Sequence, residues 1–279
     1  MDKHRKLIAE LNHGLANRLI TVIGSARLAS IEQRELYLFS PTDYSYSGNI
    51  NDALAKAFPI IESLPDQVIP SSISSSIGRS IYQPSSARQE IIKGWNHILL
   101  HQNDLIALSE NFEQSRLHIQ DELRQMGRSI IKTKSKTNHY DMGIHIRANS
   151  GLRDKNFDWV MPKRDSFIRQ ISCIVETISA QHLFLTSTDN SYVDFLGDQL
   201  SREGLEVTIT SKKSSTLSDE PSTAIDDFEC LLASRYIVRH PFSTFSALPS
   251  FLNGRTEYIY DESGAIMRRN PEFLKGCGL

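Results

Sequence analysis

An imidazole and a guanidinium stand at the end of a predicted strand in the middle of the chain. The segment Met142–Arg147 (MGIHIR) alternates apolar and other residues, which is the spacing of a short strand. Because every second side chain of a strand points to the same face, His145 and Arg147 share one face. The residues Asn149–Gly151 then form a loop, at the edge where open α/β sheets bind ligands. A guanidinium there is suited to a phosphate, since its planar fork donates two hydrogen bonds at once. An ordinary polar strand end is the alternative.

Three further polar clusters follow predicted strands or open predicted helices in the second half of the chain: Thr188 and Asp189; Asp226 and Asp227; and Ser243, Thr244, Phe245 and Ser246. In a parallel sheet the loops that follow the strands meet at one edge, so these clusters should lie near His145 and Arg147. Together they would supply a fixed cation, carboxylates that accept hydrogen bonds from a base or a sugar, and hydroxyls with backbone N–H donors. This combination is typical of a nucleotide-diphosphate site.

Each of these clusters also has a purely structural explanation. Ser243, Thr244 and Asp189 could cap the N-termini of helices, where hydroxyl and carboxylate side chains are preferred. Asp226 or Asp227 could be a solvated residue on a helix. The sequence leaves both explanations open for each cluster.

Strands and helices alternate along the chain and would position these residues. In the first half, strands are predicted at Lys6–Leu11 and Glu35–Phe39, and helices at Asn17–Ser30, Asn51–Phe58, Glu90–His101 and Glu110–Ile131. In the second half, further strands are predicted at His182–Ser187, Leu205–Thr210, Arg235–Arg239 and Glu257–Tyr260, and helices at Arg164–Ala180, Tyr192–Glu203, Thr223–Ser234 and up to Leu252. The alternation predicts an α/β fold with a mostly parallel sheet covered on both faces.

The chain divides into two halves at a polar run, Lys132–Asn138, which is predicted to be a linker and a solvated segment. We therefore expect an N-terminal α/β domain at residues 1–137 and a C-terminal one at residues 138–279, with a cleft between them as the natural site. The first domain opens with a strand, a loop containing Gly14 and a helix, an arrangement that brings backbone N–H groups near a bound anion. A serine-rich stretch, Ser71–Ser86, is either an acceptor-binding lid or a disordered insertion.

The composition argues against several classes of protein. The chain has 279 residues with 31 basic and 33 acidic side chains and a net charge of −2, so it lacks the basic surplus of a nucleic-acid-binding protein. The three cysteines (Cys173, Cys230 and Cys277) have no metal-ligand spacing and are expected to be free thiols in a reducing compartment. No apolar run reaches the roughly 20 residues of a membrane span, and no export signal follows the basic N-terminus, so a cytoplasmic protein is expected. The lysines of residues 132–136 leave peripheral contact with an anionic membrane open.

Four segments resemble motifs of the GT-B-fold fucosyltransferase superfamily, which includes nodulation α-1,6-fucosyltransferases, bacterial α-1,2-fucosyltransferases and protein O-fucosyltransferases. They are similar to its glycine loop G-x-G-N-Q/R-L, its G-V-H-I/V-R motif, its F-L-A-T-D strand end and its D-x-x-x-L-S…STFS block. The corresponding segments are Gly14–Leu19 (GLANRL), Gly143–Arg147 (GIHIR), Phe184–Asp189 (FLTSTD) and Ala224–Ser246 (AIDDF…STFS). Their order and spacing fit, so the resemblance spans nearly the whole chain.

The resemblance implies a GT-B-like α/β fold with two Rossmann-like domains facing across a cleft. The N-terminal domain would form the acceptor side, and the C-terminal domain would bind a nucleotide sugar. The implied activity is that of an inverting, metal-independent glycosyltransferase. It would transfer a sugar, in the first place fucose from GDP-fucose, to an oligosaccharide or glycoconjugate in polysaccharide biosynthesis, without a metal or other cofactor.

The resemblance also implies roles for residues of the C-terminal domain. Carried over by position, Arg147 would hold the β-phosphate and neutralise the departing GDP. His145 and Asp227 would contact the guanine or the ribose, and Asp189 would belong to the same donor site. The segment Ser243–Ser246 would bind the diphosphate through hydroxyl and backbone groups.

In the N-terminal domain, the resemblance implies that Gly14 and Asn17 bring the glycine loop against the donor across the cleft. The chain departs from the family pattern at Ala16, where many relatives have glycine, in residues 148–154 after the arginine, and at 240–242 before the serines. A donor that carries another 6-deoxyhexose could therefore bind in the same site.

The sequence does not identify the general base, for which Asp154, His13 and Asp43 are candidates near predicted loops. Two other functions stay open beside the transferase. A non-catalytic relative could bind a nucleotide sugar or a glycan without transfer, and an unrelated α/β protein could be a nucleotide-binding regulator. The chain lacks P-loop and dinucleotide motifs, which weighs against the regulator.

Overall fold

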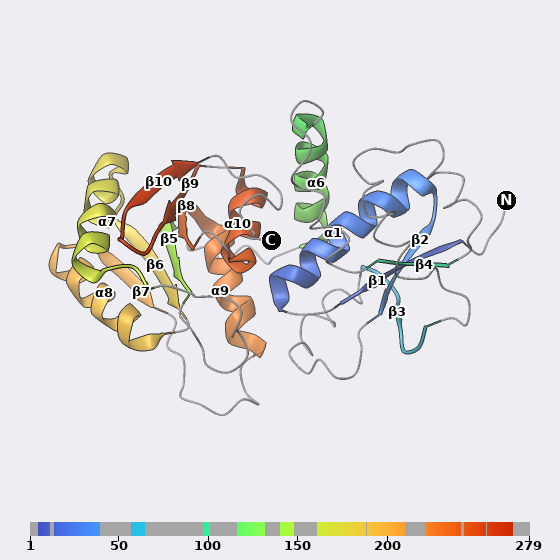
Figure 1. Cartoon of the computed structure of the whole chain (residues 1–279), viewed down its shortest axis with the longest axis horizontal. Helices are drawn as coiled ribbons and strands as arrows, with labels where there is room; N and C mark the ends of the chain where they lie inside the picture. Colours follow the sequence, from blue (N-terminus) through green and yellow to red (C-terminus); the bar gives the residue numbers. More distant parts are fainter. Residues whose placement is uncertain are drawn as a thin grey trace. The chain divides into compact units, whose positions relative to one another are not determined.

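The computed structural model describes two compact units of the chain, one up to residue 131 and one from residue 140 onward (Figure 1). The described residues are 5–11, 14–39, 57–64, 97–100, 116–131, 140–147, 161–187, 189–209, 221–240, 243–254 and 256–269. Each unit has its own sheet. The domain boundary predicted between residues 137 and 138 lies outside the described ranges and stays a prediction.

The N-terminal unit is built on a four-stranded parallel sheet in the order β3-β2-β1-β4. Its strands are β1 (Lys6–Glu10), β2 (Glu35–Phe39), β3 (Ile60–Ile61) and β4 (His97–Leu100). In β1, which has a partner on both sides, Leu7, Ile8 and Ala9 are fully buried, as expected for an apolar run inside a parallel sheet. Helix α1 (Leu15–Glu32) packs on β1 and β2, and α6 (Arg116–Ile130) packs on α1.

One predicted helix of this unit is wrong where the structure describes it. The sequence predicts a helix at Glu90–His101, but His97–Leu100 form β4, which pairs in parallel with β1. A short apolar run does not distinguish a buried strand from a helix, and pairing with β1 satisfies the backbone groups on that side of the strand. The rest of that helix lies outside the described residues, as do most of Asn51–Phe58, the serine-rich stretch and the polar run before residue 139.

The C-terminal unit contains a six-stranded sheet in the order β10-β9-β8-β5-β6-β7. Its strands are β5 (Tyr140–Ile146), β6 (His182–Ser187), β7 (Glu206–Ile209), β8 (Ser234–Arg239), β9 (Glu257–Tyr260) and β10 (Ile266–Arg269). The paired strands are parallel except for β9 with β10. Counted from β5, this is the 3-2-1-4-5-6 order of a doubly wound sheet, whose winding reverses between β5 and β8.

Helices cover both faces of this sheet (Figure 1). Helices α7 (Arg164–Ile178) and α8 (Asn190–Arg202) lie on one face, and α9 (Pro221–Ala233) and α10 (Thr244–Asn253) lie on the other. Met142, Ile144 and Ile146 of β5 belong to the core under α7 and α8. The alternation predicted for this strand is therefore confirmed, and His145 faces α10 instead.

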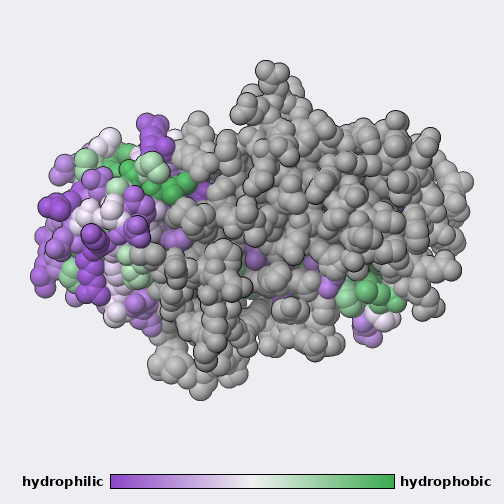
Figure 2. Space-filling view, in the orientation of Figure 1, coloured by the Kyte–Doolittle hydropathy of each residue, from purple (hydrophilic) through white to green (hydrophobic). Residues whose placement is uncertain are grey.

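The hairpin from β9 to β10 was not predicted, because the sequence of β10 (IMRR) is short and half polar. Its turn is closed by Asp261, whose Oδ1 accepts hydrogen bonds from the N–H groups of Ser263 and Ala265. Gly264 has a φ of 81°, and a Cβ there would lie 2.7 Å from the backbone nitrogen of Phe167, so the turn rests on the start of α7. Figure 2 shows hydrophobic side chains in two areas of the described surface, one near β10 and one near β3. None of the described helices combines the length and the apolar character that crossing a membrane would need.

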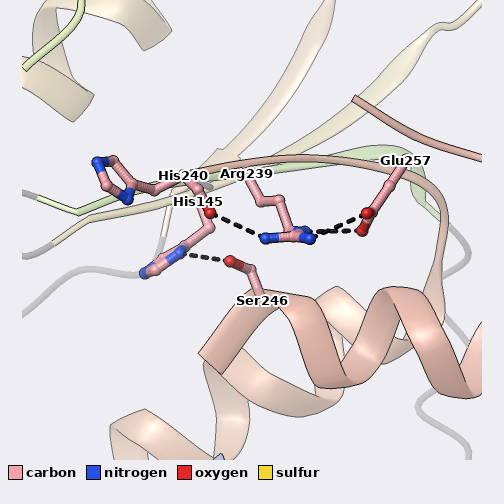
Figure 3. A network of polar contacts seen from close by, with 5 residues as sticks. All are labelled: His145, Arg239, His240, Ser246 and Glu257. Atoms are coloured by element: carbon pink, nitrogen blue, oxygen red, sulfur yellow. Dashed lines mark hydrogen bonds and ion pairs between the residues drawn. The ribbon is translucent and has the colours of Figure 1, made fainter. Parts of the chain in front are cut away.

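A fully buried ion pair links the end of β8 to the start of β9 (Figure 3). Arg239 and Glu257 are each 1% exposed, and Nε and Nη2 of the guanidinium donate to the two carboxylate oxygens at 2.7 and 2.9 Å. Nη1 of Arg239 donates to the carbonyl of His240 at 3.1 Å. Because a charge away from water is tolerated only with its partner in place, the two residues depend on each other.

We predict that Glu257→Gln lowers the free energy of unfolding by about 3–5 kcal/mol, since it leaves the guanidinium of Arg239 buried without its counter-ion. Glu206→Gln is the matched control, because it removes the same group from the His182–Glu206 pair at 3.0 Å, whose side chains are 53% and 74% exposed. There the loss should stay below about 1 kcal/mol. Urea denaturation of both variants measures the difference, and equal losses would contradict the prediction.

Candidate functional site

The reversal of winding between β5 and β8 brings together side chains from three elements. His145 and Arg147 lie at the end of β5, His240 follows β8, and Ser243 and Ser246 lie at the start of α10. Ligands of doubly wound sheets bind in the crevice at such a point. Two of the clusters that the sequence predicts to meet, the end of β5 and the serine segment, do meet here.

His145 is oriented by α10 (Figure 3). Its imidazole is buried, and its Nδ1 lies 2.9 Å from Oγ of Ser246, so the two groups share a hydrogen bond. The ring of Phe245 lies 5.3 Å from the imidazole, centroid to centroid. The hydroxyl of Ser246 is thus engaged with His145, whereas the family resemblance assigns it to the diphosphate. Ser246 thus orients the imidazole, and its contact with the diphosphate stays a prediction.

Asp227 belongs to α9, and its carboxylate is anchored to β6. Oγ1 of Thr186 donates to Oδ2 of Asp227 at 2.5 Å, and both side chains are buried. Thr186 lies opposite His145 in the pairing of β5 with β6, so this carboxylate is held one strand away from the imidazole. The alternative of a solvated helix residue is therefore wrong for Asp227, while Asp226 is half-buried.

Asp189 caps the N-terminus of α8. Its Oδ1 accepts hydrogen bonds from the hydroxyl of Ser191 at 2.7 Å and from the N–H of Tyr192 at 3.2 Å. The hydrogen bond from Ser191, ahead of the backbone bonds, holds the pKa of Asp189 below its usual value. The structural explanation is confirmed for this residue, and its contact with a donor stays a prediction. Thr188 lies outside the described residues.

Ser243 occupies the N-cap position of α10 without capping it. The side chain is 3% exposed, and its Oγ has no hydrogen-bond partner in the part of the chain that the structure describes. The capping explanation is therefore wrong for Ser243. Buried hydroxyls without a partner are rare and costly, and the N–H groups at a helix N-terminus attract anions. Ser243 and the start of α10 together form a candidate anion site.

Arg147 directly follows β5, and His240 directly follows β8 and accepts a hydrogen bond at its carbonyl from the N–H of Ser243 at 3.3 Å. Arg147 is half-buried, and its backbone N–H donates to the phenol oxygen of Tyr260 at 3.2 Å. His240 is buried, and burial, followed by the charges of Arg147 and Arg239, lowers its pKa to about 4. His240 is therefore neutral at physiological pH, and Arg147 carries the positive charge at this edge.

Sequence reasoning missed four residues of this region: Arg239, His240, Glu257 and Tyr260. Arg239 and His240 could have been found from the sequence, because they stand at the end of an apolar strand directly before the serine segment. His145 and Arg147 stand at the end of the central strand in the same way. No local pattern distinguishes a buried glutamate or a buried phenol from its exposed counterpart. These two residues are recognised only from their contacts.

The two predicted residues of the N-terminal unit lie at the start of α1. Gly14 is the exposed N-cap residue, and nothing lies within 4 Å of the place where a Cβ would stand, so packing does not require this glycine. Asn17 follows in the first turn, and its Oδ1 is buried without a hydrogen-bond partner among the described residues. Both features fit a ligand-binding loop, and the approach of this loop to the donor stays a prediction.

The structure does not identify a general base, because His13, Asp43 and Asp154 lie outside the described residues. Within the described ranges, no group of three or more His, Cys, Asp or Glu side chains is arranged to hold a metal ion.

Solved structures of fucosyltransferases share this fold. The chain is similar to fucosyltransferase NodZ from Bradyrhizobium, with a TM-score of 0.58 and 15% identity over 96% of this chain and 99% of that one. It is similar to NodZ α-1,6-fucosyltransferase soaked with GDP-fucose, with a TM-score of 0.52 and 15% identity over 96% and 99% of the two chains. It is also similar to a variant of Arabidopsis thaliana FUT1 in complex with GDP, with a TM-score of 0.56 and 13% identity over 96% and 74%. No protein-family model matches the chain, and no curated protein matches its sequence significantly.

At this level of identity the likeness concerns the fold. The predicted fold class, a GT-B-like α/β fold with parallel sheets, is confirmed. The facing of two domains across a cleft stays a prediction. The chain thus has the fold of the fucosyltransferases whose motifs its sequence resembles.

Proposed function

We propose that the chain is a glycosyltransferase that moves fucose from GDP-fucose to a glycan or glycoconjugate acceptor. The observation that carries this proposal is the group of residues at the end of β5 and the start of α10. There Arg147 directly follows the strand that carries His145, and Ser246 of α10 orients that imidazole. Ser243 at the start of the same helix is a buried hydroxyl without a partner among the described residues. The fold supports the same assignment, since the similar solved proteins are fucosyltransferases, one soaked with GDP-fucose and one in complex with GDP.

The diphosphate of the donor would lie at the N-terminus of α10. A phosphate oxygen there would accept hydrogen bonds from the Oγ of Ser243 and from the first N–H groups of the helix, including that of Thr244. The guanidinium of Arg147 would bind the β-phosphate in its planar fork. The half-buried position of Arg147 strengthens this attraction, because the surroundings screen it less than water does.

The other donor contacts follow from the same placement. His145, held by Ser246, would present its second ring nitrogen to the ribose or the guanine. Asp227, anchored by Thr186, would lie on the guanosine side of the same edge. Gly14 would bring the N-terminal loop to the donor.

The reaction proposed is a single displacement with inversion at the anomeric carbon. An acceptor hydroxyl attacks this carbon while its bond to the diphosphate breaks, GDP leaves with the bonding electron pair, and a base of the protein takes the acceptor's proton. Negative charge grows on the β-phosphate as the bond breaks, so Arg147 and the N–H groups of α10 stabilise the transition state more than the ground state. In this scheme the charge is neutralised by protein groups, and no metal ion takes part.

A non-catalytic relative that binds a nucleotide sugar or a glycan is the second candidate, and only turnover distinguishes it from the transferase. A cytoplasmic role in polysaccharide biosynthesis, without a nucleic-acid partner, belongs to the proposal as well. Its support is the composition and the resemblance of the motifs.

We predict that Arg147→Ala lowers sugar transfer by about 10²-fold or more, the scale for loss of one preorganised donor to a developing charge. The measurement is GDP released from GDP-fucose. Arg235→Ala is the control, since Arg235 is an exposed arginine at the start of β8 that stacks on Tyr236 at 5.2 Å, and its loss should leave turnover unchanged. Turnover of Arg147→Ala within a few-fold of the wild type would contradict the proposed role.

We also predict that GDP, but not UDP, TDP, CMP or ADP, stabilises the protein in a thermal-shift panel. A ligand that binds only the folded protein adds about 2.7 kcal/mol at a hundredfold excess over its dissociation constant. The effect of GDP should be lost in Arg147→Ala. A shift with another nucleotide would contradict GDP-fucose as the donor. No shift with any nucleotide would mean that the chain shares only the fold of the fucosyltransferases.

A further inference from the structure

The backbone of Arg147 is held by a tyrosine from a strand that is not its neighbour. The N–H of Arg147 donates to the phenol oxygen of Tyr260 at 3.2 Å. Tyr260 is the last residue of β9, and β8 lies between β9 and β5. Neighbouring strands are about 4.8 Å apart, so the phenol ring must cross the end of β8 to reach Arg147.

The ring of Tyr260 is clamped on two sides. It is 1% exposed, and its centroid lies 5.2 Å from that of Phe167 at an interplanar angle of 71°. His240 lies 5.5 Å away on the same ring at 76°. Both are edge-to-face contacts, the favoured geometry of aromatic pairs. The backbone of Phe167 lies against the turn at Gly264, and the packing of Phe167 and His240 on the phenol ring limits its movement.

This hydrogen bond acts at the residue where the sheet ends. The pairing of β5 with β8 stops at His145 and Arg239, and its pairing with β6 stops at Ile146 and Ser187. Arg147 lies two residues beyond the pairing with β8 and one beyond the pairing with β6, and its N–H is bound by the phenol instead. The direction in which the side chain leaves the backbone is therefore set at this point. An error of about 1 Å in the position of a catalytic group can cost two orders of magnitude in rate.

We propose that Tyr260 is a positioning residue that fixes Arg147 for the diphosphate of the donor, with Phe167 and His240 holding its ring. The proposal rests on the donor-binding role of Arg147 proposed above. Tyr260 acts through the backbone of Arg147, because its own side chain is buried away from any ligand.

Tyr192 offers a matched comparison within the same core. It is also buried and also contacts Phe167, at 6.4 Å between ring centroids. Its hydroxyl also bonds to a backbone group, but as the donor, to the carbonyl of Pro162 at 3.0 Å. Tyr260→Phe and Tyr192→Phe thus each remove one buried hydroxyl and keep the ring, but only the first touches Arg147.

The test is the affinity for GDP of the full-length wild type and both variants, by calorimetry well below their melting temperatures, together with hydrogen exchange of the Arg147 amide. Tyr260→Phe should weaken GDP binding about fivefold or more, the scale of one net hydrogen bond, and should speed exchange at Arg147. Tyr192→Phe should change neither, although both variants lose similar stability. In the wild type, the Arg147 amide should exchange slowly even though it lies beyond the paired residues.

Each outcome decides between the proposals. Equal GDP affinities in the two variants, or a rapidly exchanging Arg147 amide in the wild type, would overturn the positioning role alone, provided that GDP binding is still lost in Arg147→Ala. Absence of GDP binding to the wild type would overturn the proposed function, and this inference with it.

Discussion

The parallel pairing of β5 with β8 is the interaction on which the site depends. It joins two segments that are far apart in the chain and sets His145 opposite Arg239. Side chains alternate between the faces of a sheet, so a register shift of one residue would turn His145 into the core and an isoleucine toward α10. The same pairing creates the reversal of winding at which the helix end, the imidazole and the guanidinium meet.

Buried polar groups are the second constraint on this region. Most of them are satisfied within the protein: Arg239 by Glu257, Thr186 by Asp227, and His145 by Ser246. Such groups lock one arrangement of side chains, because each would be costly without its partner. The hydroxyl of Ser243 differs, since the described residues leave it without a hydrogen bond. This buried hydroxyl can therefore serve a bound ligand.

The distribution of charge follows from these pairs. Two arginines lie close to His240, and the carboxylate of Glu257 compensates one of them, Arg239. His240 stays neutral because burial, and after it the two positive charges, disfavours its protonated form. Positive potential at the edge therefore comes from Arg147 and from the N-terminus of α10, both preorganised by the fold. A leaving diphosphate needs stabilisation of this kind.

Much of the architecture could be predicted from the sequence, because the period of apolar residues is a local property. The pattern of β5, the strands β2 and β9, and the long helices of the C-terminal unit were predicted within a few residues. The prediction failed at β4, where four apolar residues could form either a helix or a strand and pairing with β1 decided. It missed β10, which is short and half polar and is paired with β9 by the turn between them.

The sequence by itself determined which chemical groups end the strands: an imidazole and a guanidinium after one, and hydroxyls after another. The tertiary structure alone decided what each group does. Asp189 caps a helix and Ser246 holds His145, while Ser243 is buried without a partner among the described residues. Tyr260 reaches Arg147 across the end of an intervening strand. The physical reason is that burial and hydrogen-bond partners are properties of contacts between distant segments, which residue types and their spacing do not contain.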